Sequence, residues 1–350
     1  MPQKTRLQIL GEIVTDYTPA RHEAQMLPKN HQRFLWYANF KRLHPASWAN
    51  PENIPYVAVT GLIDAYSQLP RRPDLAFNSL WSATNSSYND LYLASHLSHG
   101  AALTDSKSIE YSLERISHQL HKSIPISGVV SGGLSSISIF DLLKEYIKIA
   151  PDKNFNFVAQ YVLRGIAVES HNMRQAATTT KIREILIPST YLTFKKRFPK
   201  IHNKISNSTG LKFSNLCTIS ETPCRTDVDF GIQQANSEQA RRLVHATGKI
   251  LRQEAIAANV TKSSTQIGFD DHKHWLSFLI LPLLYATRNT AAHGNAASRL
   301  NSIFTNGNSI SSSTWTFLFC YIYFSLILLC QSKITINDLE PLYENTRINI

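Results

Sequence analysis

The chain has 350 residues, enough for one large or two ordinary domains, and its 43% hydrophobic content is that of a globular protein. The four cysteines are too sparse for a disulfide framework and show no CxxC spacing, which excludes a disulfide-stapled domain and a zinc ribbon. They fit a reducing cytoplasm. The net charge is +11, carried mostly by residues 171–262 (15 Lys and Arg against 6 Asp and Glu), which indicates either a polyanion partner or a solvated basic face.

The N-terminal residues 1–57 show scattered prolines, no signal-peptide pattern and strand-like pieces such as residues 7–14. We therefore expect a small irregular or β segment there. From Pro73 apolar residues fall three and four apart, which predicts a helix with one buried stripe, and Pro73 and Asp74 suit its first turn. The members of the stripe are Phe77, Leu80, Trp81, Thr84, Tyr88 and Leu91.

The middle of the chain mixes helical patterns with the basic stretch. Helices are expected over 106–121 and 139–149, whereas residues 155–167 are apolar throughout, so the period does not separate helix from strand. Residues 188–229 are basic and broken by Pro199, Gly210 and Pro223, which predicts an irregular insertion. A helical pattern returns over 237–258.

The C-terminal third contains two apolar helical patterns. The first covers 274–292, with a kink expected at Pro282. A polar loop, TNGNSISSST, follows, and its Ser313 or Thr314 is expected to cap the next helix. That helix, 315–330, is shorter than the roughly 20 residues needed to cross a bilayer, so we expect a buried core helix and no stable membrane insertion.

An arginine and a histidine separated by four to six residues occur four times, so the spacing alone is not specific. The pairs are Arg115/His121, Arg164/His171, Arg197/His202 and Arg288/His293. Only Arg288 is followed by a polar amide, Asn289, and only His293 stands between small residues and a glycine. This combination suits phosphodiester chemistry, because a guanidinium neutralises phosphate and an imidazole moves protons near neutral pH.

Helical geometry relates these side chains to one another. Asn289 and His293 are four apart and share a face. Arg288 lies roughly 140° around the helix from His293, so it reaches that face by swinging its side chain or across a subunit interface. If Gly294 ends the helix, the helix dipole favours a protonated His293.

Arg288-Asn289-x-x-x-His293 between two hydrophobic helices resembles the ribonuclease motif of HEPN domains (higher eukaryotes and prokaryotes nucleotide-binding). The segment AFNSLWSATNSSYND, residues 76–90, is similar to an early helix of several such domains, and the resemblance covers roughly 58–120 and 270–332. It implies a helical bundle that dimerises so that two motifs face one cleft. Members commonly cleave RNA without metal or cofactor, and many are toxins or anti-phage effectors, which adds an antitoxin or regulatory protein to the expected partners.

The resemblance assigns roles to the motif residues. Arg288 would bind and stabilise the phosphate, Asn289 would orient the groups, and His293 would transfer a proton or contact the phosphate. The reaction would be attack of a 2′-hydroxyl on the adjacent phosphorus, which requires RNA. The basic side chains expected to hold the RNA backbone are Lys195, Lys196, Arg197, Arg241 and Arg242. The alternative is a non-catalytic HEPN-like module for RNA binding or dimerisation.

A second alternative comes from Ser131-Gly132-Gly133-Leu134-Ser135-Ser136, which resembles the pyrophosphate loop of asparagine-synthetase-like ATP pyrophosphatases. A Gly/Ser loop between a strand and a helix cradles phosphate through backbone N–H groups. Ser135 stands where that family has an aspartate, which argues against metal-pyrophosphate chemistry. We therefore favour a plain turn between two helices over a degenerate nucleotide-binding loop.

The sequence predicts a mainly α protein: a HEPN-like helical bundle over 58–332 with a long basic, partly irregular insertion at about 122–265, an irregular or β N-terminal segment 1–57, and a tail 333–350. The expected partners are RNA and a second copy of the chain. No metal is expected, because the two clusters of potential metal ligands suit the start of a helix and a surface pair better. These clusters are Asp270, Asp271, His272 and His274, and His96 with His99.

Overall fold

The computed structural model describes residues 6–18, 20, 36–96, 104–127, 135–162, 189–208, 217–221, 224–228, 234–258, 268–292 and 307–348. Within these residues the chain is mainly helical, as the sequence predicts. It divides into two compact units: unit 1 comprises Met1–Pro151 and Thr287–Ile350, and unit 2 comprises Asp152–Ala286. Unit 2 therefore interrupts the sequence of unit 1 over 152–286, whereas the insertion expected from the sequence spans about 122–265.

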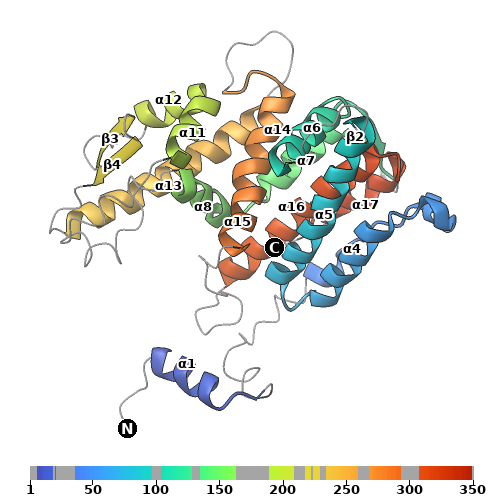
Figure 1. Ribbon diagram of the computed structural model, residues 1–350, viewed down its shortest axis with the longest axis horizontal. Coiled ribbons are helices and arrows are strands. Elements are labelled where there is room, and N and C mark those ends of the chain that lie inside the picture. The colour runs from blue at the N-terminus through green and yellow to red at the C-terminus, as the bar shows by residue number, and fades with distance from the viewer. Residues whose placement is uncertain are drawn as a thin grey trace. The chain divides into compact units, whose positions relative to one another are not determined.

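Unit 1 is built on two long helices, α5 (Pro73–His96) and α16 (Gly307–Cys330), which pack against each other (Figure 1). The predicted stripe of α5 is confirmed, since none of its six residues is more than 6% exposed. α4 (Tyr56–Gln68) and α6 (Asp105–Ser117) also pack on α5. A period of 3.6 residues therefore identified the face of α5 that enters the core.

α16 is the central helix of unit 1, with side chains buried on all sides. It begins at Gly307, so the predicted loop before it and the cap from Ser313 or Thr314 are wrong. The polar residues fit the helix because hydroxyls bond back to it: Thr316 Oγ1 donates to the Ser312 carbonyl at 2.8 Å. Among the described residues α16 is the one helix long and apolar enough to cross a membrane. Of its most apolar 18-residue stretch, 83% is buried inside the protein.

Buried hydroxyls tie α16 to its neighbours. The Tyr66 and Tyr321 hydroxyls are 2.6 Å apart, and Tyr321 also accepts the backbone N–H of Leu43 at 2.6 Å. Two residues further along α16, the Tyr323 hydroxyl lies 2.7 Å from Ser112 Oγ on α6. These pairs satisfy hydroxyls that would otherwise be buried without a partner, which is costly in an apolar core.

The remaining elements of unit 1 are short. They are α1 (Arg6–Thr15), η1 (Ala46–Ala49), η2 (Pro51–Asn53), β1 (Ser123–Pro125), β2 (Ser136–Ser138), α7 (Ile139–Lys148), η7 (Asn337–Leu339) and α17 (Glu340–Asn345). The prediction of a strand over 7–14 is wrong, because α1 satisfies its backbone groups locally instead of pairing with another strand. The region expected as a tail forms η7 and α17, and its Asn345 is fully buried, donating to and accepting from the Lys41 backbone.

Unit 2 is a smaller helical unit around α13 (Gln234–Ala257), which packs on α8 (Asp152–Val162). Its other elements are α11 (Ser189–Arg197), α12 (Pro199–Ser208), the antiparallel strands β3 (Cys217–Glu221) and β4 (Cys224–Val228), α14 (His272–Ile280) and the π-helical turn η5 (Leu281–Tyr285). The region 188–229 is therefore more regular than predicted. The break at Pro199 is confirmed, since proline begins α12 at the position where its missing N–H costs least.

Candidate functional site

The segment that leads to the arginine motif is an interrupted helix. α14 begins after Asp271, whose side chain accepts the His274 N–H at 2.7 Å. At Pro282 the helix widens into η5, where the Ala286 N–H bonds to the Leu281 carbonyl, and α15 (Ala286–Ala292) follows. The predicted kink at Pro282 is thus a π turn, which relieves the clash of the proline ring with the preceding turn. Such turns are frequent at functional sites.

Arg288 and Asn289 lie together on α15. Both side chains are partly exposed, and Arg288 Nη1 donates a hydrogen bond to Asn289 Oδ1 at 3.0 Å. The guanidinium therefore bends around the helix toward the face of Asn289, although the two Cα positions differ by about 100° on an α-helix. Among the described residues Arg288 pairs with no carboxylate, so its charge is not neutralised there.

His293, the third residue of the predicted site, lies outside the described residues, and so does Gly294. The structure describes α15 up to Ala292. The contact between His293 and the Arg288–Asn289 pair therefore stays a prediction.

The predicted RNA-binding cations lie on two helices of unit 2. Lys195, Lys196 and Arg197 form the last turn of α11, where Lys195 and Lys196 are exposed and Arg197 is half-buried. Arg242 is exposed on α13, and Arg241 is next to it on the same helix, with its side chain outside the described set. Cations in the last turn of a helix are also favoured by the helix dipole, so part of this charge stabilises α11 itself.

Of the other arginine–histidine pairs, Arg197/His202 is divided between two helices, because α11 ends at Arg197 and α12 begins at Pro199. His202 is 9% exposed, and burial lowers the pKa of its imidazole. A buried, neutral ring is unsuited to phosphate binding. Arg115 and His121 are both exposed, one on α6 and the other beyond its end.

The two groups of side chains that the sequence analysis assigned to a helix start and a surface pair make structural contacts. His274 uses both ring nitrogens: Nδ1 accepts the Asp270 N–H at 3.1 Å, and Nε2 lies 2.7 Å from the Arg197 carbonyl. Lys200 pairs with Asp270 at 2.7 Å and lowers the pKa of that carboxyl. His96 stacks on Tyr92, whereas His99 lies outside the described residues. In the described part of the chain no group of three or more His, Cys, Asp and Glu side chains is placed to hold a metal.

The Gly/Ser loop differs in its surroundings from a pyrophosphate loop. β1 and β2 pair antiparallel, so a strand separates the loop from α7, and Ser138 caps that helix with its own hydroxyl. Glu340 accepts hydrogen bonds from Ser127 N and Oγ where the chain enters the loop, and Asp141 bonds to Ser138 at 2.5 Å where it leaves. Two carboxylates at the base disfavour a phosphate there. Residues 128–134 themselves lie outside the described set.

No family model matches this chain, and the comparisons with curated proteins and with solved structures give no match either. The resemblance to HEPN domains therefore depends on the motif residues themselves.

Proposed function

We propose that this protein is a metal-independent endoribonuclease of the HEPN type, in which Arg288, Asn289 and His293 act at the junction of two copies of the chain. The observation that carries this proposal is the hydrogen bond between Arg288 and Asn289 on α15. It directs the guanidinium toward the face on which position 293 follows by helical spacing. One turn earlier, η5 interrupts the helix, a feature common near functional sites.

The chemistry follows from these side chains. The ribose 2′-oxygen attacks the adjacent phosphorus as its proton passes to a base, and the bond from phosphorus to the 5′-oxygen breaks as that oxygen gains a proton. The products are a 2′,3′-cyclic phosphate and a 5′-hydroxyl. His293 would transfer a proton, Arg288 would stabilise the charge that accumulates on the phosphate, and Asn289 would hold the guanidinium in place.

A second copy of the chain completes the proposed site. Two proton transfers are needed, and one motif contributes a single histidine, so two motifs facing one cleft supply both. The cations of α11 and α13 would attract RNA without sequence preference, through its phosphates. A role as a toxin or anti-phage effector, held inactive by an antitoxin or another regulatory protein in the cytoplasm, agrees with such an activity.

The test is cleavage of RNA by the purified full-length protein in the presence of a chelator. We expect cleavage to 2′,3′-cyclic phosphate ends, and we expect His293→Ala to abolish it with the circular dichroism spectrum unchanged. His118→Ala is the matched control, because His118 is an exposed histidine at the end of α6. An RNA with one 2′-deoxy position should resist cleavage at that position.

Two results decide against the catalytic assignment. Cleavage that persists in His293→Ala shows that another group performs the chemistry. Salt-dependent RNA binding without any cleavage indicates a non-catalytic HEPN-like module, in which the cations of unit 2 act alone.

A further inference from the structure

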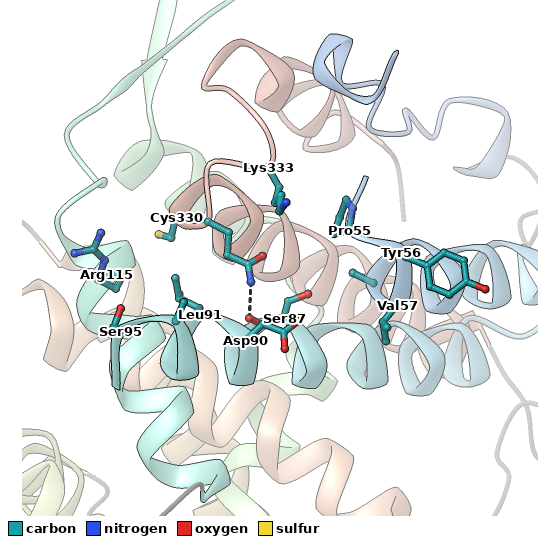
Figure 2. Close-up of a pocket in the computed structure, with 13 residues that line it drawn as sticks. Pro55, Tyr56, Val57, Ser87, Asp90, Leu91, Ser95, Arg115, Cys330 and Lys333 are labelled. Carbon is teal, nitrogen blue, oxygen red and sulfur yellow. Dashed lines mark hydrogen bonds between the residues drawn. The ribbon is translucent and has the colours of Figure 1, made fainter. Parts of the chain in front are cut away.

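Unit 1 contains a cavity of about 570 Å³ that the sequence did not predict. It is formed by the first turn of α4, one face of α5, the side of α6, and the turn that follows α16. Figure 2 shows Leu91 and Ser95 along α5, with Arg115 at one end of the cavity and Tyr56 and Val57 at the other. Its volume lies within the range of about 300–1,000 Å³ that small-molecule sites occupy.

Three charged side chains from three elements line this cavity: Asp90 on α5, Arg115 on α6, and Lys333 after α16. None of these three side chains forms a hydrogen bond or an ion pair with another described residue. The pKa of the Asp90 carboxyl is raised, and desolvation is the cause, so neither cation compensates its charge. A cavity that gathers both signs of charge without pairing them is suited to a ligand that carries groups for both.

Hydrogen bonds to backbone carbonyls, which do not involve the three charged side chains, hold the lining of the cavity in position. Gln331 Nε2 donates to the Ser87 carbonyl at 2.9 Å, which joins the end of α16 to α5 (Figure 2). The Lys333 carbonyl accepts Trp48 Nε1 at 3.0 Å and Ser47 Oγ at 3.2 Å. A ligand would therefore meet a largely preformed backbone, which reduces the entropy lost on binding.

The turn before Lys333 is a Schellman motif with an unusual residue. Lys333 N bonds to the Leu328 carbonyl at 2.9 Å, and Ser332 N bonds to the Leu329 carbonyl at 3.0 Å. Ser332 has φ 58°, the left-handed conformation in which this motif normally uses glycine. Non-glycine residues in this conformation cluster at ligand sites, where the surrounding structure maintains them.

The chemistry of the lining selects the ligand. The guanidinium and the ammonium favour an anion. The first turn of the 13-residue α4 also lines the cavity, and its backbone N–H groups, which no side chain caps, favour an anion as well. Asp90 opposes a ligand that is anionic throughout and accepts hydrogen bonds from hydroxyl or amine groups. We infer that this cavity binds a small phosphate monoester that carries hydroxyl groups, of the sugar-phosphate class, with the phosphate on Arg115 and Lys333 and a hydroxyl on Asp90.

This site is separate from the proposed nuclease site, since no residue of α15 lines the cavity. The first experiment is calorimetric titration of the full-length protein with ribose 5-phosphate, AMP, inorganic phosphate and ribose. We expect saturable binding of ribose 5-phosphate, binding of inorganic phosphate at least about tenfold weaker, and no binding of ribose. AMP that binds more tightly than ribose 5-phosphate would identify a nucleotide as the source of the phosphate.

Variants assign the contacts. Arg115→Gln and Lys333→Gln should each weaken ribose 5-phosphate binding by about tenfold or more. Lys107→Gln, an exposed cation on α6 outside the cavity, should leave it unchanged. Asp90→Asn should tighten inorganic phosphate and reduce the preference for ribose 5-phosphate over it, because it removes both a repulsive charge and a strong acceptor.

Three results would overturn the inference. The first is the absence of saturable binding at millimolar ribose 5-phosphate. The second is binding that Arg115→Gln and Lys333→Gln leave intact. The third is an equal effect of Asp90→Asn on the binding of ribose 5-phosphate and of inorganic phosphate. His293→Ala should bind ribose 5-phosphate normally, so failure of the nuclease proposal and failure of this one give different results.

Discussion

Unit 1 and unit 2 use different means to stabilise a helical fold. Unit 1 surrounds one apolar helix, α16, and pairs its buried hydroxyls with one another. Unit 2 carries 18 Lys and Arg against 10 Asp and Glu, whereas the rest of the chain carries 18 against 15. An ion pair joins two of its helices at the surface, α13 through Arg252 and α8 through Asp152, at 2.5 Å. The comparison indicates that unit 1 is organised around a buried apolar helix, while unit 2 carries most of the excess positive charge of the chain.

Two tryptophans allow the two cores to be compared directly. Trp315 in unit 1 and Trp275 in unit 2 are both fully buried, and each donates its indole N–H to a helix carbonyl, at 2.7 and 3.1 Å. We expect Trp315→Ala and Trp275→Ala each to lower the free energy of unfolding by about 3–5 kcal/mol, measured by urea denaturation. If each change affects a separate transition, the units unfold independently, whereas one shared transition would show that they unfold together. Tyr56→Ala, at a 77% exposed position, is the control and should have little effect.

Two lysines on α12 test how ion pairs contribute to unit 2. Lys204 pairs with Glu254, whose side chain is 6% exposed, whereas Lys200 pairs with the exposed Asp270. Lys204→Met leaves a buried carboxylate without its partner, so it should cost about 1–3 kcal/mol. Lys200→Met should cost at most about 1 kcal/mol, because water screens an exposed pair. Equal losses in urea denaturation would show that the burial of Glu254 does not decide the effect.

The pH dependence of the free energy of unfolding should also differ between the units. Burial lowers the pKa of His202 in unit 2 below its value in the unfolded chain, so the unfolded state takes up the proton first as pH falls. The contribution of neutral His202 is therefore fully present above the unfolded pKa of about 6.5 and decreases as pH falls below it. His202→Gln should flatten the stability of unit 2 between pH 7 and 5. A profile that keeps its slope in this variant would assign the effect to another group.

The smallest effect is expected at the turn after α16. Ser332→Gly removes the side chain from a left-handed position and should stabilise unit 1 by about 1 kcal/mol, offset in part by the greater freedom of glycine when unfolded. Thermal unfolding measures this change. A loss of stability would mean that the Ser332 side chain makes a contact worth more than the backbone preference.

Local spacing predicted much of the fold. The stripe of α5, the break at Pro199 and the interruption at Pro282 each depend on residues within a few positions of one another, which is why the sequence indicates them. The start of α16 was missed because its serines and threonines suggest a loop, yet burial and bonding to helix carbonyls accommodate them. The strand expected over 7–14 was missed for a related reason: β-branched residues favour a strand only where a partner strand exists.

The candidate sites divide in the same way. The sequence alone suggested Arg288 and Asn289 as candidates, because they are neighbours in an unusual local context. Only the structure shows the hydrogen bond that turns the guanidinium toward Asn289. The cavity of unit 1 could not be predicted, since Asp90, Arg115 and Lys333 are far apart in the chain and come from three elements. Residue spacing determines which face of a helix is apolar, and therefore the helical class of this protein. Which faces meet, and which charges gather where they do, is decided by packing across the whole unit.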